Sequence, residues 1–115
     1  MANTFKVVTK ANVTSADVIY TVAGSTTTVV LGLILGNTTA SQITATVSLA
    51  TDTGSRAGAN NEANQTVELI TSTPIPANSS LELLAGNKIV METTDALSVT
   101  GSGSTDVILS IMEMT

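Results

Sequence analysis

The carboxylates are the only side chains in this sequence suited to acid–base catalysis. The 115 residues include no His and no Cys, which removes the commonest general base, the thiol nucleophile and the usual zinc ligands. Glu68, Glu82, Glu92 and Glu113 each follow an apolar residue in an alternating stretch. A hydrolase pairing Glu68 with Glu82 is conceivable, but sugar platforms are missing because the chain has one Phe, one Tyr and no Trp. We therefore expect no enzyme, and four outward-facing glutamates that keep a sheet face soluble.

Cation and phosphate sites are also not expected. Asp52, Glu62 and Asp95 lie in turn-like segments, but no D-x-D-x-D-G loop surrounds them. The segment 101–104, Gly-Ser-Gly-Ser, contains no Lys and precedes no helix, so it is interpreted as a hairpin turn and not as a phosphate loop. The sequence thus predicts no metal and no cofactor.

Charge and hydropathy limit the partners. A net charge of −5 with only four basic residues argues against nucleic acid. The most apolar run, residues 29–35, is far shorter than the roughly 20 residues needed to cross a bilayer. The first residues lack the pattern of a signal peptide. We expect a protein made in a cytoplasm, with no membrane and no nucleic acid among its partners.

Apolar residues alternate with Thr and Ser along most of the chain, which is the pattern of half-buried β-strands. Turn signals recur every 8–12 residues, which favours one antiparallel β-sandwich or jelly roll over residues 1–115. The prediction is all-β with about eight or nine short strands, near residues 5–10, 17–22, 26–35, 42–51, 66–71, 81–84, 89–92, 97–100 and 106–114.

The sequence allows more detailed structural predictions for three segments. Residues 26–35 are apolar on both faces, which indicates a central strand covered on both sides, and Gly32 within it suggests a bulge or a close approach. Pro74 and Pro76 fix φ and remove amide donors, so residues 74–79 are expected to form a stiff link and no central strand. Val67 and Leu69 are expected to point inward.

Two regions are candidates for contacts with a partner. Residues 1–15 form either an extended amino-terminal arm that adds a strand to a neighbour or an ordinary edge strand. The polar segment 52–64 is either a contact tip or a plain surface loop. The residues we expect at these contacts are Phe5, Lys6, Val7, Arg56, Asn60 and Asn61.

The carboxy-terminal half carries a resemblance. Pro74-Ile75-Pro76-Ala77-Asn78-Ser79 leads into Leu81-Glu82-Leu83-Leu84, and Gly86-Asn87-Lys88-Ile89 and Asp106-Val107-Ile108-Leu109 follow. With the opening Met1-Ala2-Asn3-Thr4-Phe5-Lys6, this pattern resembles small virion structural proteins of tailed bacteriophages, especially phages of marine cyanobacteria. The likeness spans most of the chain and consists of turn and strand patterns.

The resemblance implies a β-sandwich that coats or connects parts of a virion. It favours a capsid decoration (cement) protein bound to the major capsid protein or another virion protein, as a homo-oligomer and most simply a trimer. A tail, neck or fibre component has the same composition. A third alternative is a host-surface binding module that uses the loop at 52–64.

Overall fold

A computed structural model describes residues 3–51, 65–84 and 87–115 of the chain. In these residues the chain forms strands and turns and no helix. The strands are β1 (Asn3–Val13), β2 (Ala16–Thr21), β3 (Thr27–Asn37), β4 (Ile43–Thr51), β5 (Gln65–Ile75), β6 (Ser80–Leu83), β7 (Ile89–Met91), β8 (Ala96–Gly101) and β9 (Thr105–Met114). The predicted all-β fold is confirmed.

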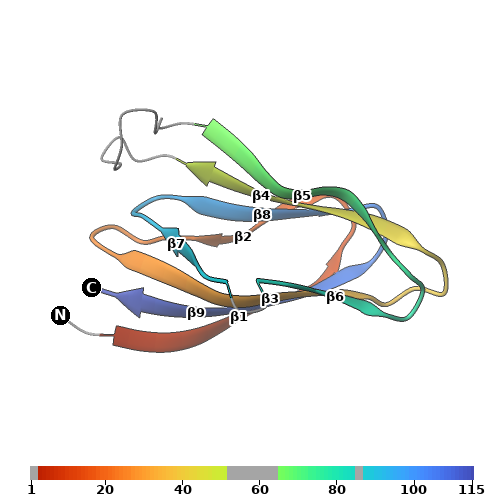
Figure 1. The fold of residues 1–115 in the computed structure, drawn as a ribbon, viewed down its shortest axis with the longest axis horizontal. Helices are drawn as coiled ribbons and strands as arrows, with labels where there is room; N and C mark the ends of the chain where they lie inside the picture. Colours follow the sequence, from red (N-terminus) through yellow and green to blue (C-terminus); the bar gives the residue numbers. More distant parts are fainter. Residues whose placement is uncertain (1–2, 52–64, 85–86) are drawn as a thin grey trace.

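The strands form two antiparallel sheets packed face to face. The five-stranded sheet has the order β1-β9-β3-β6, and β7 pairs with β3 beside β6. The four-stranded sheet has the order β2-β8-β4-β5. In Figure 1, β4, β5 and β8 lie in the upper layer and β1, β3 and β9 in the lower one. The antiparallel sandwich is thus confirmed.

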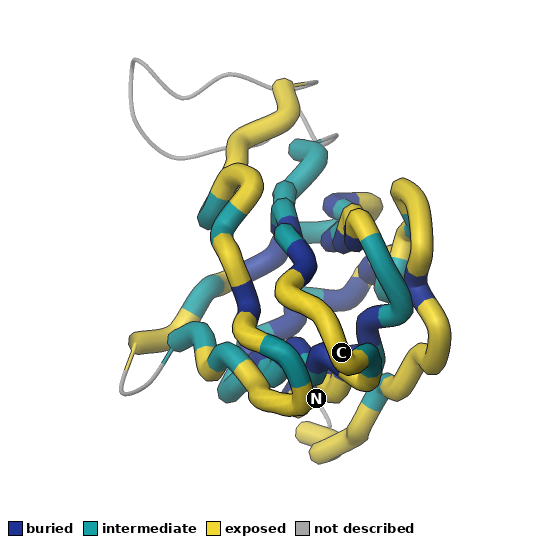
Figure 2. The backbone as a smooth tube through the Cα atoms, turned by 90° about the vertical axis from the view of Figure 1, so that its right-hand side faces the viewer, coloured by how far each residue is buried: buried dark blue, intermediate teal, exposed yellow. Residues whose placement is uncertain are grey.

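The core lies between the sheets, and both contribute alternate residues to it. Leu33, Leu109 and Ile111 come from the five-stranded sheet and Val47 and Val99 from the four-stranded one, all at most 1% exposed. Burying such a side chain contributes roughly 1.5–3 kcal/mol. Figure 2 shows the buried segments gathered inside and exposed ones around them. The alternation that predicted the strands therefore also selects the core.

The central strand β3 is covered on one face only. The register between β3 and β9 shifts between Val30 and Gly32, which confirms the expected bulge. Val30 and Leu33 point into the core. Val29 and Ile34, on the other face, are only half-buried, because no described segment of the chain packs over them. The expectation of cover on both sides is wrong for the described part of this chain.

Two connections also differ from expectation. Residues 101–104 do not form a hairpin, because β8 belongs to the four-stranded sheet and β9 to the other. The chain crosses between layers there, and a Cβ on Gly101 would lie 2.6 Å from the Val13 carbonyl oxygen. β5 continues through Pro74 to the buried Ile75. Proline is tolerated there because β5 is an edge strand.

Candidate functional site

The outer face of the five-stranded sheet is the most unusual surface of the molecule. Cross-strand pairing places Phe5 beside Met112, and Met112 beside Val29. It likewise places Val7 beside Ser110, and Ser110 beside Gly32. We call the outward side chains of these strands the outer face: Phe5, Val7 and Thr9 of β1, Ile108, Ser110, Met112 and Met114 of β9, and Val29, Leu31, Gly32 and Ile34 of β3.

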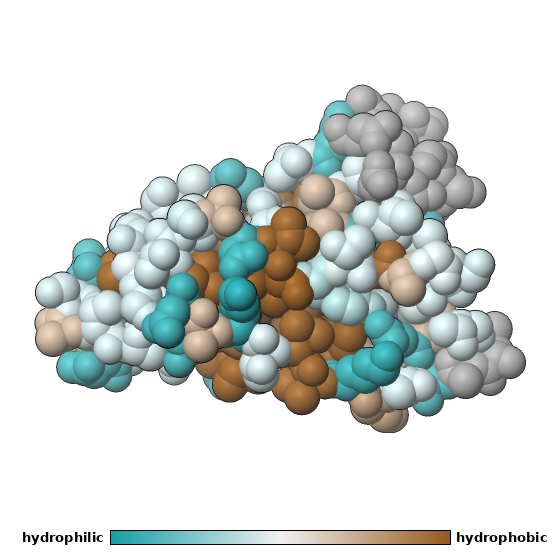
Figure 3. Space-filling model, turned by 180° about the vertical axis from the view of Figure 1, so that it is seen from behind, coloured by the Kyte–Doolittle hydropathy of each residue, from teal (hydrophilic) through white to brown (hydrophobic). Residues whose placement is uncertain are grey.

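Large apolar side chains on this face are open to solvent. Phe5 is 71% exposed, Val7 63% and Ile108 44%, and Val90 on neighbouring β7 is 59% exposed. Val90 pairs with Val29 and therefore continues the same face. Figure 3 shows the opposite side of the molecule from Figure 1, and hydrophobic surface also gathers near the middle of that side. Contiguous apolar patches on a soluble protein usually mark a contact surface.

No charged side chain belongs to the outer face as defined. Two carboxylates lie on the same side of the sheet at its margin: Glu82 of β6, which pairs with Ile34, and Asp106 at the start of β9. The other strand residues of β1 and β9 that carry charge, such as Lys6 and Glu113, point the opposite way, toward the four-stranded sheet. An uncharged apolar face on a chain of net charge −5 is the composition of the centre of a protein interface.

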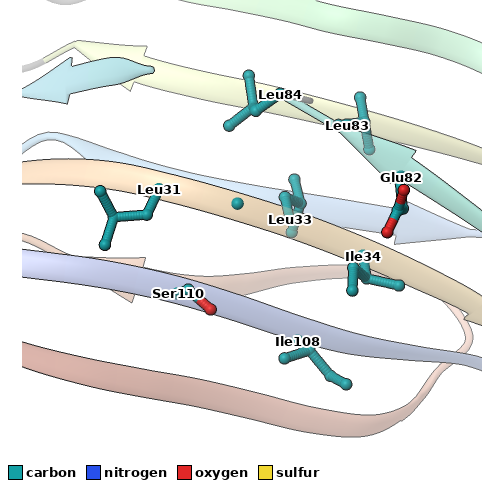
Figure 4. Close-up of a pocket in the computed structure, with 9 residues that line it drawn as sticks. Leu31, Leu33, Ile34, Glu82, Leu83, Leu84, Ile108 and Ser110 are labelled. Atoms are coloured by element: carbon teal, nitrogen blue, oxygen red, sulfur yellow. The ribbon is translucent and has the colours of Figure 1, made fainter. Parts of the chain in front are cut away.

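A hollow of about 240 Å³ opens on this face. It lies over β3 between β6 and β9, and Figure 4 shows the side chains around it. A Cβ built on Gly32 would meet nothing within 4 Å, so the missing side chain of this glycine leaves part of the space. The hollow is bordered by Leu31, Ile34, Leu84, Ile108, Ser110 and Glu82. Its lining is mostly aliphatic and suits an apolar or aromatic side chain.

A polar cluster lies on the other face of the same strands. Glu113 Oε1 is 2.7 Å from Lys6 Nζ. The Tyr20 hydroxyl donates to Glu113 Oε2 at 2.5 Å and lies 2.8 Å from Thr28 Oγ1. These residues come from β1, β2, β3 and β9, so the cluster joins the two sheets near the chain termini. The glutamate expected to face outward at position 113 therefore points inward, because its carboxylate has partners there.

The two ionisable groups of the cluster shift in opposite directions. Burial, followed by the hydrogen bond to Glu113, raises the pKa of Tyr20 to about 12. The hydrogen bond from Lys6, followed by that from Tyr20, holds the pKa of Glu113 below its usual value. Neither shift prepares a group for catalysis near neutral pH, because both move away from 7. The cluster is structural, and its only signal in the sequence is a weak one, the single tyrosine.

The predicted contact residues fall into three groups. Phe5 and Val7 lie on the outer face, and β1 is an edge strand paired with β9. Lys6 is 53% exposed but faces the other way, toward Glu113. Arg56, Asn60 and Asn61, with the loop 52–64, lie outside the described residues. Sequence reasoning missed the hollow, since Gly32 was interpreted as a bulge or a close approach and not as an open space.

The described residues hold few groups for other chemistry. Within them, no three His, Cys, Asp or Glu residues are placed to hold a metal ion together. Asp95, a candidate calcium ligand, is buried and accepts a hydrogen bond from the Glu92 amide at 3.0 Å. The searched part of the chain also has no helix with the length and hydropathy to cross a membrane.

Comparisons with known proteins find distant likenesses of fold. No protein-family model and no curated protein matches the chain. A Bacillus endospore appendage protein, from a family of disulfide-linked pili, is 14% identical with a TM-score of 0.49, over 99% of this chain and 87% of the other. A protein of the T13 IBDV viral particle is 11% identical with a TM-score of 0.35, over 96% of this chain and 35% of the other. Likenesses this distant carry no argument about function.

Proposed function

We propose that this protein is a non-enzymatic structural subunit of a phage virion, and specifically a capsid decoration protein bound to the major capsid protein. The observation that carries the structural role is the outer face, which is largely apolar and uncovered by the described chain. The virion itself rests on the resemblance of the turn and strand pattern to phage structural proteins. A homo-oligomer is part of the proposal; the trimer that the resemblance favours is one form of it, and the two-fold dimer proposed in the next subsection is the alternative.

The proposed mechanism is mechanical. Each copy removes an apolar sheet face from water against a neighbouring subunit, at roughly 25 cal/mol per Å² of apolar area. A single contact of this kind is modest after the costs of association are subtracted. Many copies on one lattice bind together, so the summed effect on the particle is large.

The test is the copy number of this protein in purified particles, measured by quantitative mass spectrometry against the major shell protein. We expect about one copy per shell subunit, and we expect particles without the protein to lose their genome at lower temperature. A ratio of a few per cent would instead place the protein in the neck, tail or fibres. Absence from particles would overturn the virion role and leave the host-surface binding module.

A further inference from the structure

We propose that the outer face binds the same face of a second copy of this chain, with Phe5 of each copy inserted into the hollow at Gly32 of the other. The proposal names a partner for the surface used in the proposed function, and it rests on that function only in assuming that the surface is covered. The projecting side chain and the hollow are both present on one face. Phe5 of each copy can therefore fill the hollow of the other copy without a third component.

The positions of Phe5 and Gly32 fit a two-fold contact. Phe5 lies on β1, the neighbour of β9 on one side, at the level of Met112. Gly32 lies on β3, the neighbour of β9 on the other side, at the level of Ser110. Two strand spacings and two residues separate them by about 12 Å. A two-fold axis lying in the interface, across the midpoint, exchanges the two positions, so both insertions form at once, as isologous contacts require.

The axis crosses β9 between Ser110 and Met112. The axis runs obliquely to the strands. The two-fold rotation therefore makes the strands of one copy cross those of the other at roughly 70°, close to the orthogonal mode of sheet packing. Ser110 and Met112 lie at equal distances on either side of the axis, and the small, exposed Ser110 permits close approach of the two sheets on its side. Ser110 of one copy is therefore expected to lie near Ser110 of the other.

Charge permits a second copy as the occupant, and size sets how strongly it binds. The chain carries a net charge of −5, and like charges oppose self-association, but Phe5, Ser110 and Gly32 lie on an uncharged part of the face, with Glu82 at the β6 border of the hollow. Three strands of about ten residues cover roughly 450 Å² in projection. This area lies below the roughly 800 Å² per partner of a standard stable interface. We expect a reversible dimer that forms at micromolar concentration and not a permanent one.

The first test is sedimentation equilibrium of the full chain and of two variants. Phe5→Ala removes the inserted ring, and Gly32→Leu fills the hollow. Gly32→Leu should fold, because nothing lies within 4 Å of the new Cβ and the φ angle of Gly32 is not left-handed. Each variant should weaken the dimer roughly tenfold or more, as for central interface residues. The matched control is Val18→Ala, an equally apolar and 57% exposed position on the other sheet, which should leave the dimer unchanged.

The second test uses the absence of cysteine from the sequence. A bismaleimide whose reach matches the roughly 10 Å spacing of packed sheets should cross-link Ser110→Cys copies into a covalent dimer, and should not cross-link Ser98→Cys copies, because Ser98 lies on the four-stranded sheet. Equal cross-linking of both, a monomer at all concentrations, a trimer, or a dimer insensitive to Phe5→Ala and Gly32→Leu would each overturn the proposal. These solution results are independent of copy number in particles, so the two proposals fail separately.

Discussion

Glu113 shows how one carboxylate can join parts of the chain that are distant in sequence. It binds Lys6 of β1 and, 93 positions away from itself, Tyr20 of β2. Its side chain is only 15% exposed, and a carboxylate in such a place needs partners to offset the loss of water. The cluster holds the edge strand β1 against the rest of the fold, which keeps the outer face continuous across β1 and β9.

Tyr20 is the only tyrosine and the chain has no tryptophan, so tyrosinate absorbance reports this residue alone. We expect the folded protein to titrate at a pKa of about 12, above the ordinary value of 10.0. A folded pKa raised above the unfolded one means that Tyr20 stabilises the fold fully below pH 10 and loses this contribution as the pH rises toward 12. Tyr20→Phe should flatten the fall in unfolding free energy over that range. A titration of the folded protein at 10 would contradict the geometry.

Glu113 is expected to affect the free energy of unfolding at acid pH. Its pKa is lowered, chiefly by Lys6, so its stabilising contribution is present above the unfolded value near 4.5 and is lost as the pH falls through the folded pKa. Urea unfolding of Glu113→Gln should therefore show a weaker dependence on pH below 4.5 than the parent. Glu82→Gln removes the same charge from an exposed position and serves as the control. An equal flattening by both variants would mean that the cluster does not contribute.

At the scale of the elements, Asn37 fixes where β3 ends. It is 3% exposed, and its side-chain amide donates to the carbonyl oxygens of Ser41 at 2.8 Å, Ile75 at 3.0 Å and Pro76 at 3.1 Å. Its Oδ1 accepts from the Thr39 amide at 2.9 Å. One buried side chain thus ties the end of β3 in one sheet to the end of β5 in the other.

Asn37→Ala should therefore destabilise the protein by about 3 kcal/mol in urea unfolding, because the buried Ile75 carbonyl and the part-buried carbonyls of Ser41 and Pro76 lose their donor. Asn37→Asp should cost more, since carboxylate oxygens would face those carbonyls. Thr38→Ala is the neighbouring control, because its exposed hydroxyl bond to Ser104 should contribute no more than about 0.5 kcal/mol. Similar losses for Thr38→Ala and Asn37→Ala would show that Asn37 does not anchor the strand.

The strands could be predicted from the sequence, and their assignment to sheets could not. A period of two is a local property, so residues 43–51 and 105–114 could be recognised as strands from alternation alone. Whether β8 turns back on β9 or crosses to the other layer depends on packing that no local pattern records. Val67 illustrates the same limit: it pairs with Leu49 but is 51% exposed, because it lies on the edge strand β5.

The candidate site was predicted in the same uneven way. Phe5 and Val7 could be predicted as contact residues, because apolar side chains in a first strand need to be covered by another part of the chain or by a partner. The hollow at Gly32 could not, because it depends on how β6 and β9 flank β3. The apolar character of β3 on both faces was visible in the sequence, but it indicated cover from within the chain. In the structure the same pattern describes a face that is open.

At the scale of the whole molecule, the two surfaces of the sandwich differ in kind. The four-stranded sheet presents Thr and Ser outward, such as Thr46, Ser48 and Ser98. The five-stranded sheet presents Phe, Val, Ile and Met. Asn3, at the start of β1, and Met114, at the end of β9, pair with each other at one end of the molecule (Figure 1). When copies of such a subunit assemble, the apolar sheet is expected to face the partner and the polar sheet to face the solvent.

Salt distinguishes an apolar contact from a charged one. The net charge of −5 makes two copies repel, and the proposed contact contains no ion pair to offset this. Raising ionic strength shortens the Debye length from about 10 Å at 0.1 M to about 3 Å at 1 M, which screens the repulsion and leaves the apolar contact intact. The dimer measured by sedimentation should therefore become tighter, or hold, as salt rises.

A matched pair of variants completes this prediction. Ser110→Lys brings two like charges together near the proposed axis and should abolish the dimer at low salt, whereas Ser98→Lys adds the same charge to the other sheet and, by lowering the net negative charge, should strengthen it slightly. Partial recovery of the Ser110→Lys dimer at high salt would support the two-fold geometry, because screening acts on charges that face each other. A parent dimer that weakens steadily with salt would show that charged residues, and not the outer face, hold the copies together.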